Sequence, residues 1–334
     1  MQAFVIRGGF GLDHLAHETR PDPAPGPGQV LVRVRAASLN YRDLLVARGE
    51  YNPKLPLPRV LGSDGAGEVV AVGAGVTAWT PGDRVIGCFF QSWSDGPLTD
   101  AAARSALGAD RDGVLAELVA FEEGGLVAVP GHLSFEEAAT LPCAAVTAWH
   151  ALRAAGIGTG STVLAQGTGG VSVFALQLAK ALGARVLLTT RSADKAVRAA
   201  ELGADAVCVT ADTPAWEKWA FEQTGRRGVD LVVEVGGAGT MERSLRAVRY
   251  GGHIGLIGVL SGPGAFNPIL AVMKGATVHG IFVGSRGHFE GLNAVLAAHQ
   301  IRPVIDRVFP FADAPAAFRH LEGGVHVGKV VIAL

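Results

Sequence analysis

A glycine-rich turn between two hydrophobic segments constrains the fold of this chain more than any other feature. Residues 162–166 predict a buried strand, residues 167–172 form the turn, and residues 173–182 predict a helix that ends at Gly183. The largely apolar residues 185–190 then predict a second buried strand. A strand, a glycine turn, a helix and a second strand make a βαβ unit, which is the frame of many dinucleotide-binding sites.

The turn has the sequence Gly-Thr-Gly-Gly-Val-Ser. Gly167 permits a tight turn, and Gly169 lets the backbone approach a pyrophosphate, which would lie on the N-terminus of the helix. Ser172 occupies the third position of the G-x-G-x-x-G pattern and is small enough for close helix–strand packing. Glycine clusters also occur as plain turns, so the flanking strands and helix give the pattern its weight. The expected cofactor-binding residues of the turn are Gly167, Thr168, Gly169, Gly170 and Val171.

The pattern divides the chain into two domains. Residues 1–125 contain short strands separated by Gly/Pro turns, which favours a small barrel or a partly open β-domain. Residues 126–284 alternate between helix and strand and predict a doubly wound α/β sheet. Residues 285–334 should complete the first domain, because their last segment predicts a strand. The six strands of the second domain are expected near 162–166, 185–190, 205–209, 230–234, 253–257 and 277–283.

Composition argues against several classes of protein. The 334 residues are 49% hydrophobic and 18% charged, which is typical of a globular chain. A formal net charge of −1 provides no basic surface for nucleic acid or an anionic membrane. The first residues lack the apolar core of a signal peptide, and no apolar run has the length of a membrane span. Three widely spaced cysteines give no disulfide framework. We therefore expect a cytoplasmic protein without nucleic-acid or membrane partners.

A family resemblance rests on motifs that follow one another in a fixed order. They lie at residues 38–43, 61–70, 72–76, 81–85, 140–144, 167–172 and 328–331. Over essentially its full length the chain resembles the medium-chain dehydrogenase/reductase superfamily, and most of all the zinc-independent branch that includes quinone oxidoreductases and enoyl reductases. The resemblance implies a GroES-like β-barrel catalytic domain, a Rossmann domain with a six-stranded parallel sheet, and NAD(P)H-dependent oxidoreductase activity on a small molecule.

The zinc site of the related alcohol dehydrogenases has no complete ligand set in this chain. A catalytic zinc needs three deprotonated protein ligands and one open position. The matching positions here hold Asn40, Ser63 and Cys143, of which only the cysteine is a good ligand. The relatives' structural zinc uses four clustered cysteines, and residues 89–113 contain none. The sequence therefore predicts no bound metal.

Asn40 and Tyr51 are the candidate catalytic residues. They belong, with Asp43, to an N-x-x-D pattern followed by Arg48, Gly49 and Tyr51, a combination that resembles the pattern of quinone reductases. The Asn40 amide can orient the nicotinamide ribose or a substrate carbonyl, while Tyr51 can donate a proton or hydrogen bond to an enolate oxygen. Alternatively, Asn40 caps a turn, Asp43 caps the following helix, and Tyr51 is a rim aromatic. Asp64 either holds Asn40 in place or belongs to a turn.

We expect the residues that select between NAD(H) and NADP(H) to lie at the end of the strand 185–190. NAD-binding enzymes usually place an acid there, whereas this chain has Arg191, Ser192 and Lys195. These side chains suit a 2′-phosphate, so NADP(H) is favoured over NAD(H). The alternatives are that Ser192 is only a helix N-cap and Lys195 only a solvated side chain.

Further cofactor contacts follow from the family resemblance and from the carboxyl ends of the later strands. They are Thr147, Gly236, Gly258, Val259, Val283 and Lys329. Packing is the alternative for Thr147, and simple exposure is the alternative for Lys329. The aromatic residues of segment 89–113 either roof an apolar substrate pocket or pack the segment onto the barrel.

These features favour an NADPH-dependent enzyme that transfers hydride to an activated double bond or a quinone. A zinc-independent alcohol or carbonyl dehydrogenase is the first alternative, and a dinucleotide-binding protein without turnover is the second. The strand expected at 277–283 would leave an apolar sheet edge exposed in a monomer. Relatives pair this strand across a two-fold axis, so we expect a homodimer.

Overall fold

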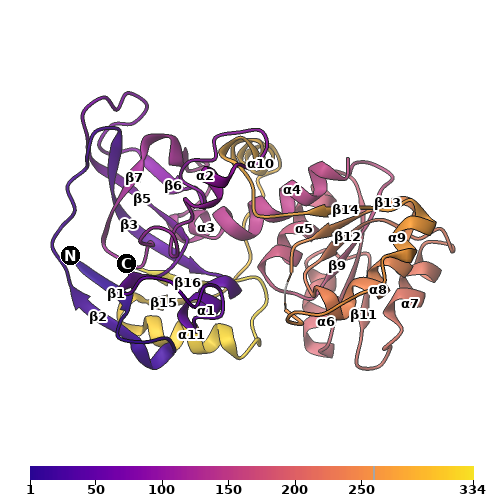
Figure 1. Ribbon diagram of the computed structural model, residues 1–334. Coiled ribbons are helices and arrows are strands. Elements are labelled where there is room, and N and C mark those ends of the chain that lie inside the picture. Colours follow the sequence, from indigo (N-terminus) through magenta and orange to yellow (C-terminus); the bar gives the residue numbers. More distant parts are fainter. Residues whose placement is uncertain (259) are drawn as a thin grey trace. The chain divides into compact units, whose positions relative to one another are not determined.

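The computed structural model describes residues 1–258 and 260–334, which form two compact units (Figure 1). The first unit comprises Met1–Val146 and Val283–Leu334, and the second comprises Thr147–Phe282. The boundary lies later than the expected one at residue 125, because helix α3 (Phe135–Ala139) packs on strands β3 (Gln29–Leu39) and β5 (Asp64–Val72) of the first unit.

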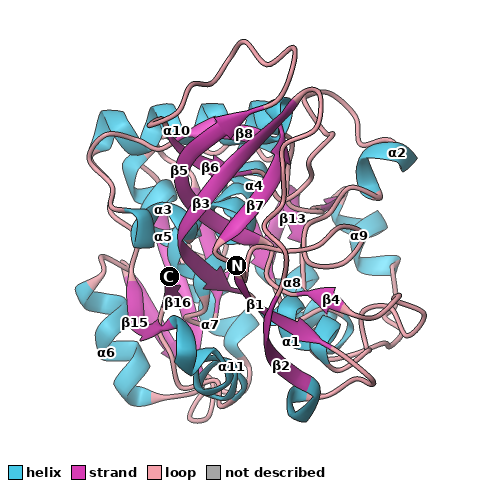
Figure 2. Cartoon of the chain, turned by 90° about the vertical axis from the view of Figure 1, so that its left-hand side faces the viewer, coloured by secondary structure: helices cyan, strands magenta, loops and turns pink. Residues whose placement is uncertain are grey.

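The first unit is built around a seven-stranded sheet with the order β15-β16-β3-β5-β6-β8, in which β7 pairs with β3 off this path (Figure 2). A second sheet has the order β2-β1-β4. The remaining strands are β1 (Gln2–Ile6), β2 (Leu15–Thr19), β4 (Arg59–Val60), β6 (Arg84–Gly87), β7 (Leu118–Glu122), β8 (Leu126–Ala128), β15 (Ile305–Pro310) and β16 (Lys329–Ala333). The helices are α1 (Tyr41–Ala47), α2 (Asp100–Ala103), α3, α10 (Arg286–His299) and α11 (Ala314–Glu322).

The end of the chain completes the first unit, as its strand-forming sequence predicts. Strand β16 pairs antiparallel with β3, so that Val330 lies opposite Leu39 and Ile332 lies opposite Ala37. Both partners are almost fully buried in the same apolar core. This register places Lys329, the first residue of β16, beside the end of β3 where helix α1 begins.

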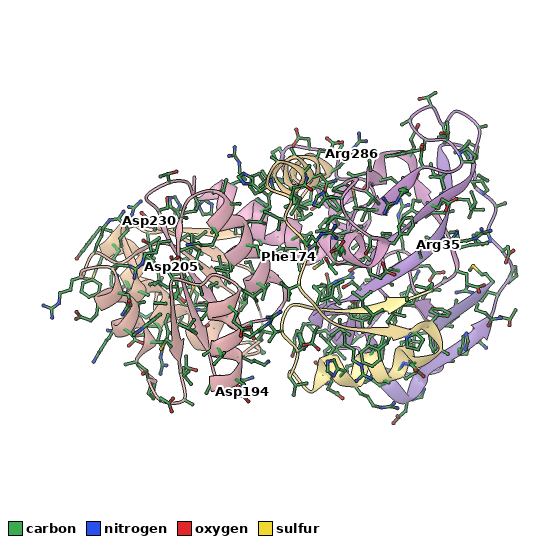
Figure 3. All side chains as sticks on the ribbon, turned by 180° about the vertical axis from the view of Figure 1, so that it is seen from behind. Arg35, Phe174, Asp194, Asp205, Asp230 and Arg286 are labelled. Carbon is green, nitrogen blue, oxygen red and sulfur yellow. The ribbon has the colours of Figure 1, made fainter. Side chains whose placement is uncertain are left out.

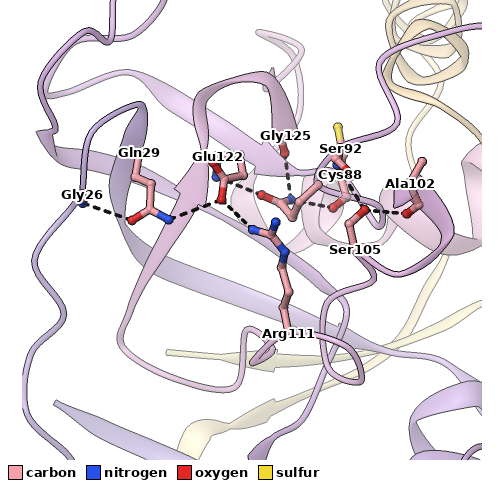
Figure 4. Close-up of polar contacts among 10 residues, drawn as sticks. Gly26, Gln29, Cys88, Ser92, Ala102, Ser105, Arg111, Glu122 and Gly125 are labelled. Carbon is pink, nitrogen blue, oxygen red and sulfur yellow. Dashed lines mark hydrogen bonds and ion pairs between the residues drawn. The ribbon is translucent and has the colours of Figure 1, made fainter. Parts of the chain in front are cut away.

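Segment 89–113 is fastened to the first unit by buried polar contacts (Figure 4). The Gln91 amide donates to the carbonyls of Cys88 at 2.9 Å and Gly125 at 3.1 Å, and it accepts from the Glu122 backbone N–H at 3.1 Å. Arg111 adds an ion pair with Glu122 at 2.6 Å. The segment is therefore part of the scaffold.

The second unit is a six-stranded parallel sheet with the order β11-β10-β9-β12-β13-β14. This is the doubly wound order of Rossmann domains. The strands are β9 (Thr162–Gln166), β10 (Arg185–Thr190), β11 (Ala206–Val209), β12 (Val229–Glu234), β13 (Val248–Leu256) and β14 (Thr277–Gly280). The helices are α4 (Val146–Ala154), α5 (Gly170–Ala181), α6 (Ala193–Glu201), α7 (Trp216–Gln223), α8 (Ala238–Ala247) and α9 (Ile269–Lys274).

Helix α5 forms because its apolar residues recur at helical spacing and bury one broad face. Phe174, labelled in Figure 3, is one of its fully buried side chains. Gly183 follows the helix with a φ of +79°, a conformation that favours glycine at a helix end.

The ends of two strands in this sheet differ from the sequence-based expectation. Strand β13 begins at Val248, earlier than expected, and β14 ends at Gly280 instead of residue 283. Val283 has a left-handed φ of +53°, which is incompatible with continued strand geometry.

Among the helices that the structure describes, none has the length and apolarity that spanning a membrane requires.

Candidate active site

The glycine turn has the geometry that a dinucleotide phosphate requires. Gly167 ends strand β9 with a φ of +76°, and Gly169 is the N-cap of helix α5. A Cβ atom added at either glycine would meet no protein atom within 4 Å. Packing therefore does not explain the glycine at position 169, whose φ of −74° suits any residue. Open space in front of a helix N-terminus is what a pyrophosphate needs, so the chain's residues fit this group.

A buried polar network lies behind this turn, and sequence reasoning missed it. Glu234 at the end of β12 is fully buried, and its carboxylate accepts hydrogen bonds from Gln166 Nε2 at 2.8 Å and Thr240 Oγ1 at 2.6 Å. The Ser244 hydroxyl also donates to Glu234. The network ties the carboxyl ends of β9 and β12 together. The available signal was a polar residue at the end of each of two apolar strands.

At two of the expected cofactor-binding glycines, the surrounding protein leaves no room for a side chain. A Cβ at Gly236 would lie 2.2 Å from Thr240 Oγ1, and one at Gly258 would lie 1.5 Å from the Val235 carbonyl oxygen. The Gly236 N–H also donates to Glu234 at 2.8 Å. Val259, the next expected contact, lies outside the described residues.

The expected dinucleotide-selecting residues lie at the start of helix α6. Ser192 is its N-cap and accepts the Lys195 backbone N–H at 3.5 Å, as the capping alternative predicted. Arg191 lies between β10 and α6 and is exposed. Its guanidinium has no hydrogen-bond or ion-pair partner among residues 1–258 and 260–334. The cation is therefore available to an anionic ligand.

In the first unit, Asn40 and Asp43 together form the cap of helix α1. The Asn40 backbone N–H donates to Asp43 Oδ2 at 2.8 Å, and the two residues form a capping box. This confirms the capping alternative for both residues. The Asn40 side chain is nevertheless buried, and it belongs to a larger polar cluster.

That cluster, which we call the Asn40 cluster, consists of Asn40, Ser63, Asp64, Cys143 and Lys329. Lys329 Nζ donates to Asn40 Oδ1 at 2.6 Å and to the Leu39 carbonyl at 2.8 Å. On the other side of the amide, Asn40 Nδ2 lies 3.4 Å from Ser63 Oγ.

Asp64 is the anion of the Asn40 cluster. One of its oxygens accepts the Ser63 hydroxyl at 2.7 Å, and the other accepts the Cys143 backbone N–H at 3.1 Å. It also forms an ion pair with Lys329 at 3.9 Å. Asp64 thus holds the loops around Asn40, as expected of a supporting residue.

Burial shifts the acidity of both carboxyl groups. It raises the pKa of Asp43 from 3.8 to about 6, although the Arg42 cation and the Asn40 N–H act in the opposite direction. Burial also raises the pKa of Asp64, against the effect of the Lys329 ammonium and of hydrogen bonds to its carboxylate. Both shifts follow from the cost of holding a charge away from water.

The donor set of the Asn40 cluster does not fit the zinc ion implied by the family. Asn40 and Ser63 present a neutral amide and a hydroxyl, and burial raises the pKa of the Cys143 thiol. The Lys329 ammonium lies within hydrogen-bond distance of Asn40, where it would repel a second cation. Among residues 1–258 and 260–334, no group of three or more His, Cys, Asp or Glu side chains is arranged to hold a metal ion.

Tyr51 is not hydrogen-bonded to Asn40 within the described structure. Its ring is 38% exposed and stacks on the Arg42 guanidinium, 4.7 Å from ring centroid to Cζ. Arg42 also stacks on Phe89 at 4.5 Å and donates to the Leu107 carbonyl at 2.8 Å. Arg42, which sequence reasoning did not single out, thus connects Tyr51 to segment 89–113.

The aromatic residues of segment 89–113 pack the segment onto the barrel. Phe89, Phe90 and Trp93 are 2%, 1% and 6% exposed. Phe90 stacks edge-on against both of the others. Of the two remaining expected contacts, Thr147 is buried on α4, and Val283 is buried where the first unit resumes.

Comparisons with known proteins agree with this architecture. The family model for zinc-binding dehydrogenases matches residues 170–298, and the model for the alcohol dehydrogenase GroES-like domain matches residues 26–131. A zinc-type alcohol dehydrogenase-like protein of Schizosaccharomyces pombe is 41% identical over 97% of this chain and 96% of its own. An acryloyl-coenzyme A reductase of Metallosphaera sedula is 33% identical, with 99% of each chain covered.

Solved structures give the same result. A Sinorhizobium meliloti protein solved as a candidate alcohol dehydrogenase has a TM-score of 0.92 at 41% identity, covering 100% of this chain and 98% of its own. An NAD-dependent alcohol dehydrogenase has a TM-score of 0.90 at 36% identity, and a mycobacterial protein complexed with NADPH has 0.84 at 30%, each with 100% of both chains covered. Because these matches span the whole chain, it belongs to the medium-chain dehydrogenase/reductase superfamily of NAD(P)H-dependent oxidoreductases.

Proposed function

We propose that this protein is an NADPH-dependent reductase of activated double bonds, such as enones, or of quinones, and that it works without zinc. The observation that carries the proposal is the Asn40 cluster, which offers hydrogen-bond donors in place of metal ligands. A plain ketone needs a strong Lewis acid for activation, whereas a conjugated acceptor is already electrophilic at its β-carbon. The similarity to an acryloyl-coenzyme A reductase supports this substrate class.

The proposed reaction transfers a hydride and a proton to the acceptor. NADPH, when bound at the glycine turn, supplies a hydride to the β-carbon of the acceptor. The electron pair of the double bond moves to the carbonyl oxygen, and the resulting enolate accepts a proton at its α-carbon from Tyr51 or water. Asn40 Nδ2 is the donor that would stabilise the enolate oxygen, because its hydrogen bond to Ser63 Oγ is long, at 3.4 Å, and a primary amide has a second N–H to donate.

NADPH is proposed over NADH because Arg191 offers a free cation at the position where the ribose is selected. The mycobacterial structural neighbour with NADPH supports the same choice. The NAD-dependent neighbour makes NADH the comparison that must be measured.

The proposal is tested by following the absorbance of NADPH with a panel of small enones, quinones and simple ketones. We expect turnover with the conjugated acceptors in chelated buffer, and a large loss of kcat in an Asn40→Ala variant. Robust oxidation of a simple alcohol together with no turnover of any conjugated acceptor would refute it. That result would instead support an alcohol or carbonyl dehydrogenase, which the named alcohol dehydrogenase neighbours favour. Cofactor binding without turnover on the whole panel would support a non-catalytic dinucleotide-binding protein.

We also infer that the protein is a homodimer formed through strand β14 and helix α9 of the second unit. Helix α9 is apolar, yet none of its residues is buried, and Val272 and Met273 are 75% and 68% exposed. Val278 on the edge strand and Phe282 beyond it are also exposed. Exposed apolar residues on a sheet edge and on a surface helix favour pairing with a second copy. Sedimentation that gives a monomer at micromolar concentration would contradict the inference.

A further inference from the structure

Lys329 is a buried cation, and the expected contact with the cofactor does not explain why it is buried. Its side chain is 2% exposed, and its ammonium already contacts Asn40, Leu39 and Asp64 in the first unit. A buried ammonium is costly unless it is paired and hydrogen-bonded. An exposed lysine could bind a phosphate without that cost. The contacts of Lys329 therefore indicate a role inside the Asn40 cluster.

The ammonium determines which end of the Asn40 amide faces which neighbour. A lysine ammonium can only donate hydrogen bonds, so the group that lies 2.6 Å from Nζ has to be the amide oxygen. The amide nitrogen then faces the side of Ser63. A neutral partner able both to donate and to accept, such as a hydroxyl, would leave the two ends of the amide interchangeable.

Lys329 and Asp64 each have partners other than Asn40. Asp64 is held by the Ser63 hydroxyl and the Cys143 N–H, and Lys329 is held by the Leu39 carbonyl and the strand pairing of β16. The amide is therefore oriented by a rigid neighbour, which is the condition for a preorganised donor.

We propose that Lys329 is the positioning residue of the active site: it holds Asn40 so that Nδ2 donates to the developing enolate oxygen. A fixed ammonium of the chain thus supplies positive charge beside Asn40, a residue that matches a zinc-ligand position of the related alcohol dehydrogenases. This role rests on the proposed reduction of conjugated acceptors. It is distinct from the expected cofactor contact, because the partners of the Lys329 ammonium on which it rests are Asn40, Leu39 and Asp64.

The test uses a charge-balanced variant and a mutant cycle. Lys329→Met alone would leave Asp64 as an unpaired buried charge, so it is combined with Asp64→Asn. Thermal unfolding checks that this double variant folds. We expect the affinity for NADPH to stay within about twofold of wild type and the KM for the acceptor within about threefold. The kcat should fall by about 10²-fold, which is the scale of losing one oxyanion donor.

Non-additivity distinguishes positioning from simple scaffolding. In an Asn40→Ala background, the Lys329→Met and Asp64→Asn changes should lower kcat by less than about threefold further, because they act through the same amide. Full additivity would overturn the proposal, as would an unchanged kcat in the charge-balanced variant. Weaker NADPH binding at unchanged kcat would also overturn it and would return Lys329 to the cofactor site.

A second variant keeps the proposal testable if the charge-balanced protein does not fold. Asn40→Asp retains an acceptor for Lys329 and replaces the Nδ2 donor by a carboxylate oxygen, which also adds a negative charge beside Asp64. We expect a thermal midpoint at least equal to that of Asn40→Leu and a kcat lower by about 10²-fold. Retained kcat would overturn the proposal. A failure of the proposed function itself is separate, because wild type would then reduce no conjugated acceptor, and the cycle would be run on whatever substrate turns over.

Discussion

Replacing Asp43 by Asn should change how the stability of the protein depends on pH. Asp43 is 1% exposed, and burial raises its pKa to about 6 from 3.8. Asp43 Oδ2 accepts the Asn40 N–H, whereas Oδ1 has no hydrogen-bond partner among residues 1–258 and 260–334. Asn keeps an acceptor for the Asn40 N–H and resembles the protonated, neutral form of the acid.

The sign follows from proton binding. Between 3.8 and about 6 the folded state retains a proton that the unfolded state has released. The contribution of Asp43 to stability is therefore complete below 3.8 and is lost as the pH rises through about 6. With 1.36 kcal/mol per pKa unit, wild type should lose about 2 kcal/mol from this group between about pH 4.5 and about pH 8.

The assay is urea unfolding of wild type and Asp43→Asn at several pH values. The difference in free energy of unfolding should move in favour of the variant by about 2 kcal/mol between about pH 4.5 and about pH 8. A constant packing effect of the substitution cancels in this comparison. The exposed Asp212→Asn is the matched control and should show little change. A difference for Asp43→Asn that stays constant with pH, or moves the other way, would refute the reasoning.

Three further predictions concern the second unit. Gly169→Ala should keep the thermal midpoint of wild type, since a Cβ there meets no atom within 4 Å. It should nevertheless weaken NADPH binding about tenfold or more, because the methyl group fills the space for the phosphate. The control Gly258→Ala should be destabilised instead, because its Cβ would lie 1.5 Å from a carbonyl oxygen. Arg191→Ala should reduce the preference for NADPH over NADH in kcat/KM by about tenfold, mainly through NADPH, and an equal loss with both dinucleotides would contradict a 2′-phosphate contact. Val272→Asp, at a 75% exposed position, should leave the fold intact and convert the dimer to a monomer in sedimentation; a persistent dimer would place the interface elsewhere.

Local signals carried the predictions that the structure confirms. Strand β9 and the helix after the glycine turn follow from apolar periodicity within a few residues. The doubly wound order follows from the alternation of strand and helix.

Edges and special backbone conformations were less predictable. The sequence of residues 277–283 has strand character, yet β14 ends at Gly280. Gly236 and Gly258 stay predicted cofactor contacts, and each also lies at a close approach within the protein that no local pattern encodes.

The sequence by itself determined the family, the two-unit organisation and the dinucleotide turn, because these depend on periodicity and on short motifs whose residues are neighbours along the chain. Only the tertiary structure decided how the site is held. Lys329 reaches Asn40 across 289 residues, and Gln166 reaches Glu234 across 68. Such contacts depend on the pairing of β16 with β3 and of β9 with β12. Pairing over that separation brings donors and acceptors together in space, so their partners become visible only once the sheets have formed.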